Sequence, residues 1–152
     1  MSHPVPDTLA YLAGRWTVTR ALEDLSTGAT GRFLGTADIQ PSDDGARALL
    51  VEDGELVWAA TANRAGRTLR LLPRPDGTAE VTFADGRPFH DLDLRSGRWA
   101  VHHPCGRDRY EGVFTVVSPH EWRVRWRTVG PAKDHLQQSV YRRASGTRHA
   151  AS

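Results

Sequence analysis

The segment Trp122-Arg123-Val124-Arg125-Trp126-Arg127-Thr128 indicates the fold class, because apolar and charged residues alternate along it. Side chains of a β-strand point alternately to opposite faces of a sheet, so the segment predicts a strand with one buried and one solvated face. The same alternation recurs at residues 16–22, 33–39, 81–83 and 99–103. Glycine, proline and Asp-Gly turn signals separate these segments, and no stretch keeps the apolar spacing of a helix beyond a turn or two. The sequence therefore predicts an all-β protein.

The length and composition are those of a single globular domain. The chain has 152 residues, of which 39% are hydrophobic and 25% charged, as in ordinary soluble proteins. An antiparallel meander of this length must hide its edge strands, and closing about eight to ten strands into one up-and-down barrel does so. We expect the barrel over residues 9–143, between a flexible N-terminus (residues 1–8) and a disordered tail (residues 144–152).

The charge balance and the single cysteine indicate which binding partners and which cellular compartment to expect. Lysine and arginine total 20 against 18 for aspartate and glutamate, which is too balanced for a surface that binds nucleic acid phosphates. No apolar run approaches the roughly 18 residues that a membrane span requires. Cys105 has no second cysteine to pair with, and the first seven residues lack the features of a secretion signal. We expect a cytoplasmic monomer or homodimer that contacts neither nucleic acid nor membrane.

The first predicted strand carries a short family signature. Leu12, Gly14 and Trp16 stand in an L-x-G-x-W order that resembles the opening strand of the calycin group, which includes lipocalins, fatty-acid-binding proteins and nitrobindin-like proteins. The resemblance implies a calycin-like barrel in which the tryptophan closes one end against a basic residue of the last strand. Arg142 or Arg143 is placed to be that residue.

The second half of the chain carries a longer resemblance. The segments FADGRPFH (residues 83–90), HPCGRDRYEG (residues 103–112) and VGPAKD (residues 129–134), followed by residues 141–143, resemble a family of small bacterial and fungal proteins of unknown function. That resemblance extends over nearly the whole chain. The family brings no known activity, so the chemistry has to be argued from the residues.

Ser96-Gly97 is a two-residue hairpin signal that sets the register of the strands on either side of it. With that turn His90 faces His103, and their Cβ atoms are expected about 4.5 to 5.5 Å apart. Matching the apolar faces of neighbouring strands extends the alignment. It pairs Phe83 with His90, His103 with Tyr110, and Tyr110 with Thr128. The resulting inward row contains Phe83, His90, His103, Tyr110 and Thr128.

The predicted functional site is the mouth of the barrel at the end where this row lies. The connections at that end carry the chemically reactive groups Asp85, Arg87, Cys105, Arg107, Asp108, Lys133, Asp134 and His135. The turns at the opposite end are tight and carry little chemistry. Ligands enter barrels at mouths built from variable loops on a rigid scaffold, so we place the site there.

The leading functional hypothesis is an acid–base enzyme (an isomerase, cyclase, dehydratase or hydrolase) acting on a small, partly apolar organic substrate. His90 and His103 would exchange protons, because imidazole titrates near neutrality. Tyr110 would donate a hydrogen bond to developing oxyanion charge, and Arg20 or Lys133 would hold a carboxylate or phenolate. In the structural alternative, the two histidines share a hydrogen bond and serve packing only.

Other chemistries remain open at the same residues. Cys105 is a candidate nucleophile with a histidine as its base. Lys133 and Asp134 form either a loop salt bridge or a Schiff-base site. We expect no cofactor, the alternative being a transition metal or haem held by His90, His103 and Cys105.

Two further alternatives concern ligand binding. Arg20 points inward by alternation and either anchors an anionic ligand or is structural, and a carboxylate partner such as Glu52 would favour the structural role. A carrier without catalysis is the alternative to an enzyme. The remaining candidate ligand-binding residues are Phe83, Arg87, Trp99, Asp108, Trp126 and Thr128.

Overall fold

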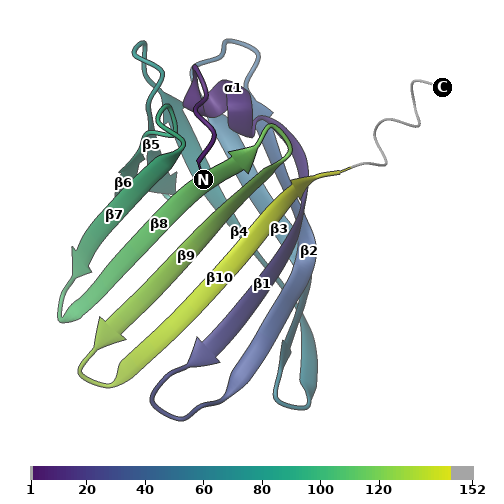
Figure 1. The fold of residues 1–152 in the computed structure, drawn as a ribbon, viewed down its shortest axis with the longest axis vertical. Helices are drawn as coiled ribbons and strands as arrows, with labels where there is room; N and C mark the ends of the chain where they lie inside the picture. Colours follow the sequence, from purple (N-terminus) through teal and green to yellow (C-terminus); the bar gives the residue numbers. More distant parts are fainter. Residues whose placement is uncertain (1, 145–152) are drawn as a thin grey trace.

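The computed structural model describes residues 2–144 and confirms the all-β prediction. One short helix, α1, precedes ten antiparallel strands that form a single sheet (Figure 1). The elements are α1 (Thr8–Leu12), β1 (Gly14–Asp24), β2 (Thr30–Pro41), β3 (Ala48–Trp58), β4 (Thr61–Pro73), β5 (Ala79–Phe83), β6 (Pro88–Leu92), β7 (Arg98–Cys105), β8 (Asp108–Ser118), β9 (Glu121–Gly130) and β10 (Lys133–Arg143). Of the predicted tail, residues 145–152 lie outside the described part. No helix within residues 2–144 is long and apolar enough to span a membrane.

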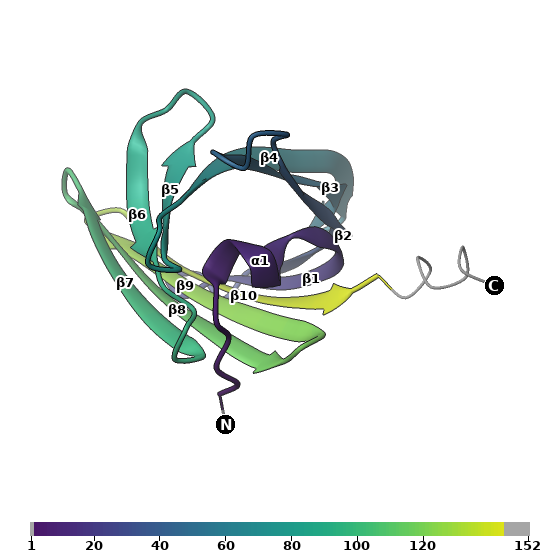
Figure 2. The same ribbon diagram turned by 90° about the horizontal axis from the view of Figure 1, so that it is seen from above.

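The sheet curls into a nearly closed up-and-down barrel, as predicted. Its strand order is β6-β5-β4-β3-β2-β1-β10-β9-β8-β7. Every strand therefore pairs with its neighbours in sequence except β6 with β7, and β1 also pairs with β10. The order ends on β6 and β7, which leaves a seam between these two strands (Figure 2). Alternation fills the interior: along β9, Trp122 and Val124 are buried while Arg123 and Arg125 are exposed.

The helix and the residues before it close one end of the barrel (Figure 2). Asp7 caps α1 by accepting from the Ala10 backbone N–H, an arrangement that satisfies a free donor of the first turn. The backbone N–H groups of His3, Val5 and Thr8 donate to carbonyls of Val116, Arg95 and Gly77, respectively. The segment predicted to be flexible therefore makes specific contacts with β8 and with two connections between strands. The barrel opens at the other end.

The tryptophan of the L-x-G-x-W signature has the role that the calycin resemblance implies. Trp16 is fully buried, and the Arg143 guanidinium carbon lies 4.0 Å from the centre of its ring. Arg143 also donates to the carbonyls of Ala13 and Tyr11 at 2.8 and 2.6 Å. Arg143, and not Arg142, is thus the basic residue that closes this end.

Two of the residue pairings predicted for the inward row are confirmed. His103 lies opposite Tyr110 across β7 and β8, and Tyr110 lies opposite Thr128 across β8 and β9. Both pairings follow the matching of apolar faces along these strands.

The predicted hairpin between β6 and β7, and with it the pairing of His90 with His103, is wrong. Ser96 and Gly97 do form a tight turn, closed by the Gly97 N–H on the Leu94 carbonyl at 2.8 Å. No ladder follows it, because the N-terminal segment takes the backbone groups that would begin one. Thr8 Oγ1 accepts from the Leu94 N–H at 3.0 Å, and the Arg95 carbonyl accepts from Val5.

The predicted pairing of Phe83 with His90 is wrong as well. His90 lies opposite Val81, and the register shifts between Val81 and Thr82, because Thr82 pairs with Pro88. Phe89 is therefore an extra residue in β6. This bulge decides which side chains reach the barrel interior.

Candidate functional site

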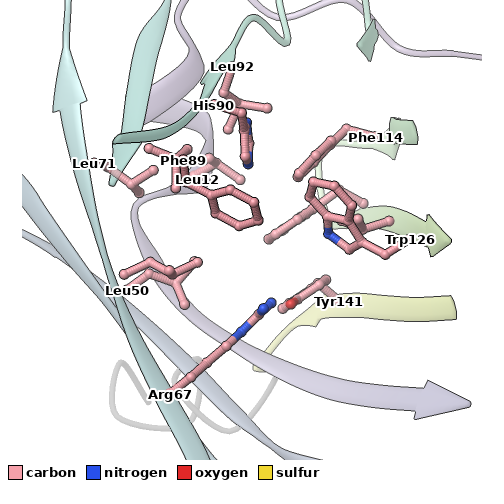
Figure 3. Close-up of a pocket in the computed structure, with 14 residues that line it drawn as sticks. Leu12, Leu50, Arg67, Leu71, Phe89, His90, Leu92, Phe114, Trp126 and Tyr141 are labelled. Carbon is pink, nitrogen blue, oxygen red and sulfur yellow. The ribbon is translucent and has the colours of Figure 1, made fainter. Parts of the chain in front are cut away.

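The barrel encloses a cavity beneath α1, called here the central cavity (Figure 3). Its empty space is about 430 Å³, including the part that opens to solvent. The lining is apolar and aromatic except for Arg67, His90 and Tyr141. The lining residues are Leu12, Leu50, Arg67, Leu69, Leu71, Val81, Phe89, His90, Leu92, Phe114, Trp122, Val124, Trp126 and Tyr141.

The bulge in β6 brings two consecutive side chains to this cavity. In a regular strand, neighbouring residues face opposite sides of the sheet. Phe89 and His90 both line the cavity, because the extra residue rotates the strand locally. Bulges are frequent next to functional sites for this reason, since they redirect a side chain.

His90 is held as a neutral imidazole with a defined tautomer. Its Nδ1 lies 2.7 Å from the carbonyl oxygen of Asp91, and a carbonyl only accepts, so Nδ1 carries the proton. Burial lowers the pKa of His90 below its usual value, and the nearby His103 adds to this effect. Nε2 therefore keeps a free lone pair, the requirement for a general base or a hydrogen-bond acceptor.

Aromatic rings form the wall around His90. The rings of Phe89 and Trp126 are nearly parallel, with centroids 5.4 Å apart and an interplanar angle of 13°. Phe83 stacks on the other side of Phe89, with centroids 4.6 Å apart. Phe114 meets Trp126 edge to face. Such a wall favours a ligand that contains a planar ring.

A buried ionic cluster, called here the Glu52 network, lies at the side of the central cavity away from α1. The Glu52 carboxylate, whose side chain is 1% exposed, accepts from Arg20 Nη2 and Arg67 Nε, each at 3.0 Å from Oε1. The Tyr141 hydroxyl donates to Glu52 Oε2 and accepts from Arg20. Ser139 Oγ accepts from Arg20 Nε at 2.7 Å. A buried carboxylate is tolerated only with such partners.

The network fixes the charge state of each member. Burial alone would raise the pKa of Glu52, but the charges of Arg67 and Arg20 outweigh it and hold that pKa below its ordinary value. Burial, reinforced by the Glu52 charge, raises the pKa of Tyr141 to about 12. At neutral pH the network therefore contains two cations, one anion and a neutral phenol.

The two arginines differ in how far they are enclosed. Arg20 is 9% exposed, whereas Arg67 is 38% exposed although it points into the barrel (Figure 3). Arg67 lines both the central cavity and a second interior space, which lies on the open side of the network beside Leu22 and Leu56. The accessible surface of Arg67 therefore faces the interior of the barrel.

One wall residue carries an unmatched donor. Trp122 stacks on Tyr141 with ring centroids 3.8 Å apart and an interplanar angle of 2°. Its indole Nε1 is, within residues 2–144, the one buried side-chain polar atom without a hydrogen-bond partner. Buried donors are rarely left unmatched, so this N–H indicates an acceptor supplied by a water molecule or a ligand.

The predicted catalytic residues are distributed between the cavity and the open end. His90 lines the central cavity, whereas His103 and Tyr110 contact each other, with ring centroids 6.1 Å apart, outside its lining. The Phe89 ring lies against both imidazoles. Cys105 is exposed at the end of β7.

The predicted pairing of Lys133 with Asp134 is wrong. Lys133 Nζ lies 3.0 Å from Asp108 Oδ2, and Asp134 forms two hydrogen bonds with Arg127. The reason is geometric, because successive residues of a strand face opposite sides of the sheet. Asp134 meets Arg127 on the neighbouring β9, whereas Lys133 reaches past Gly130 of β9 to Asp108 on β8. The hydrogen bond and charge of Asp108 raise the pKa of Lys133, which keeps this amine protonated at neutral pH.

The predicted ligand-binding residues also lie in different parts of the barrel. Trp126 lines the central cavity, and Phe83 packs against Phe89 from outside the lining. Arg20 has the Glu52 partner that favours a structural role. Trp99 donates to the Asp91 carbonyl across the seam at 2.8 Å. At the open end, Arg87 pairs with Asp85 and Asp108 pairs with Lys133, while Thr128 is half-buried on β9.

No group of three or more histidine, cysteine, aspartate or glutamate side chains in the described residues could hold a metal ion. The alternative ligand set His90, His103 and Cys105 is therefore not assembled in residues 2–144.

Sequence reasoning missed Arg67 and Tyr141 as cavity residues and named Glu52 only as a partner for Arg20. The sequence does contain a signal for Arg67, because the alternation that places Leu71 and Leu69 on the inner face of β4 places Arg67 there as well. Nineteen of the 20 basic residues are arginines, so one arginine in an apolar register did not stand out.

Comparisons with known proteins agree with this fold. The Family of unknown function (DUF6314) matches residues 12–143, as the segments of the second half indicated. No curated protein sequence matches the chain. The S-type phycobiliprotein lyase CPES from Guillardia theta is similar in structure, with a TM-score of 0.65, 10% identity and 90% of each chain covered. A protein of unknown function from the DUF3598 family of Nostoc punctiforme has a TM-score of 0.52 at 12% identity, and the match covers 94% of this chain and 51% of that one. At these identities the likeness establishes the fold alone.

Proposed function

We propose that this chain, which belongs to the Family of unknown function (DUF6314), binds a small, partly apolar organic molecule in the central cavity of its barrel. The observation that carries the proposal is the composition of the cavity wall. Aromatic and aliphatic side chains form most of it, and His90, Arg67 and the Trp122 N–H add a few polar groups. Ligand sites have this character, since apolar surface supplies affinity and sparse polar groups fix orientation.

The geometry favours a ligand with a planar ring. Phe89 and Trp126 stack on each other in the cavity wall, and His90 and Arg67 reach into the cavity on different sides of these rings (Figure 3). A ring beside Phe89 and Trp126 gains aromatic contacts of about 0.5 to 1.5 kcal/mol beyond the burial of its area. A polar substituent can then meet one of the two side chains.

The proposal is tested by titrating the full chain with 2-naphthamide, a neutral two-ring probe, and following tryptophan fluorescence and the indole N–H signals in NMR spectra. We expect saturable binding that shifts the Trp122 and Trp126 signals. Val124→Phe fills the cavity from β9 and should abolish binding, whereas Val113→Phe adds the same bulk on the outer face of β8 and should not. Equal binding by both variants, or none by the parent chain, would overturn the proposal.

Acid–base catalysis on the bound molecule is the second candidate function. It is favoured by one observation, the neutral His90 imidazole whose Nε2 is free while Nδ1 is fixed on the Asp91 carbonyl. A base held in one tautomer with a pKa below its usual value can accept a proton at neutral pH. In this reaction His90 takes the proton, the ligand lies against Phe89 and Trp126, and Arg67 stabilises negative charge that develops on the ligand.

A substitution at His90 distinguishes an enzyme from a protein that only binds and carries its ligand. In an enzyme, His90→Gln keeps the ligand affinity within a few-fold and lowers turnover by about 10² to 10⁴, the usual contribution of a general base. If the protein is only a carrier, the parent chain itself shows no turnover. Retention of full turnover in His90→Gln would exclude His90 as the base.

A further inference from the structure

We propose that the ligand of the central cavity is a singly charged anion, a ring-bearing carboxylate whose carboxylate group pairs with Arg67. This inference rests on the proposed function and specifies the chemical class of the ligand. Its basis is the imbalance of charge and of hydrogen-bond donors inside the barrel.

The charges within the Glu52 network do not cancel. Arg20 and Arg67 contribute two positive charges and Glu52 contributes one negative charge, while the Tyr141 phenol stays neutral. His90 adds no compensating charge, because a histidine is either neutral or positive. The interior therefore carries one unmatched positive charge, and burying such a charge is unfavourable without a partner.

The unmatched charge resides on Arg67. Arg20 donates to Glu52, Ser139 and Tyr141 and is almost fully enclosed. Arg67 donates to Glu52 through Nε and also shares a side-chain hydrogen bond with the neutral Tyr141, so Glu52 is its one anionic partner among the described residues. More than a third of the Arg67 side chain is accessible inside the barrel. A guanidinium edge with two N–H donors matches the two oxygens of a carboxylate.

The Trp122 N–H is an independent observation that points to the same kind of ligand. This ring lines the central cavity and stacks on Tyr141, which belongs to the Glu52 network. Its Nε1 is buried and has no acceptor among the described residues. An anionic group brings acceptor oxygens and a negative charge, whereas a cation or a purely apolar ligand would leave the second positive charge unmatched and the Trp122 N–H without an acceptor.

The experiment compares 2-naphthoate with 2-naphthamide, which differ in charge but share the same rings. Both are titrated at pH 7, where the carboxyl group is ionised, into the full chain and its variants. We expect the parent chain to bind naphthoate at least about tenfold more tightly than the amide, the ratio that 1.4 kcal/mol of charge pairing gives. Arg67→Gln should remove this preference and change the affinity for the amide little. Arg67→Lys should keep part of it, because lysine retains the charge but not the paired donors.

The matched control is Arg64→Gln. Arg64 belongs to the same strand, β4, but pairs with Asp53 on the exterior of the barrel, where its side chain is 76% exposed. It should leave the preference for naphthoate unchanged. Arg67→Gln is expected to fold, because Arg20 still neutralises Glu52, and circular dichroism and thermal melting establish this before titration.

The outcomes separate this inference from the proposed function. If the amide binds as tightly as naphthoate, the anion inference fails and the proposed binding site stands. If naphthoate is preferred but Arg67→Gln keeps the preference, Arg67 is not the anchor. If neither probe binds the parent chain, both proposals fail.

Discussion

Arg67 Nε lies 3.0 Å from Glu52 Oε1, yet more than a third of the Arg67 side chain is accessible inside the barrel. Arg20 contacts the same oxygen at the same distance and is almost completely enclosed. One carboxylate thus serves two arginines of different accessibility. The two arginines are therefore expected to differ in role, Arg20 stabilising the fold and Arg67 facing a ligand.

The first prediction is that Glu52→Gln destabilises the fold strongly. The substitution keeps the shape of the side chain but leaves Arg20 and Arg67 as uncompensated interior cations. Removing one partner of a buried ion pair typically lowers the free energy of unfolding by about 3 to 5 kcal/mol. Urea unfolding followed by tryptophan fluorescence measures this change.

The control for this substitution is Asp53→Asn on the next residue of β3. Asp53 pairs with Arg64 on the exterior, and both side chains are largely exposed. Its loss should change the unfolding free energy little, because exposed pairs are screened by solvent. Equal effects at residues 52 and 53 would show that the Glu52 network is not structural.

The second prediction is that Glu52 contributes to acid sensitivity. The folded state holds the pKa of Glu52 below the ordinary value of 4.5, so the unfolded chain binds the proton more readily. The contribution of Glu52 is complete above that ordinary value and is lost as the pH falls towards the folded-state pKa. Unfolding free energies of the parent chain should therefore fall more steeply between about pH 5 and pH 3 than those of Glu52→Gln. Parallel curves for the two proteins would contradict the depressed pKa.

The barrel was predictable because its evidence is local and repeated. Alternation along residues 122–128 and the matching of apolar faces give the pairing of β7 with β8 and of β8 with β9, including His103 opposite Tyr110. A slip by one residue would expose every large apolar side chain of a strand, at about 1.5 to 3 kcal/mol each. This penalty makes the register readable from the sequence.

The seam and the bulge were not predictable in the same way. A two-residue turn at Ser96-Gly97 normally continues into a ladder. Here Thr8, more than 80 positions away in the sequence, bonds the Leu94 backbone instead. The extra residue Phe89 depends on how β5 and β6 meet. His90 was identified from its type and its inward position, and the alternation along β4 indicated Arg67, but the role of Phe89 needed the tertiary structure.

The third prediction concerns the contact that replaces this ladder. Thr8→Val keeps the shape of the side chain but leaves the Leu94 N–H without its acceptor, and Leu94 is almost fully buried. An unmatched buried donor costs about 1 to 3 kcal/mol of unfolding free energy. Urea unfolding should show this loss for Thr8→Val but not for Thr8→Ser, which keeps the hydroxyl. Thr17→Val removes a long 3.4 Å contact on the exterior and should change the unfolding free energy little.

The fourth prediction is the protonation state of His90. Nitrogen NMR of the labelled chain should show Nδ1 protonated and Nε2 unprotonated, because Nδ1 lies 2.7 Å from the Asp91 carbonyl oxygen. The pKa obtained by titration should lie below the ordinary value of 6.5, since burial opposes the charged imidazolium. His90→Gln identifies the signal by its disappearance. A protonated Nε2 would remove the free lone pair on which catalysis by His90 depends. It would not affect the preference for naphthoate attributed to Arg67, because no atom of His90 takes part in that contact.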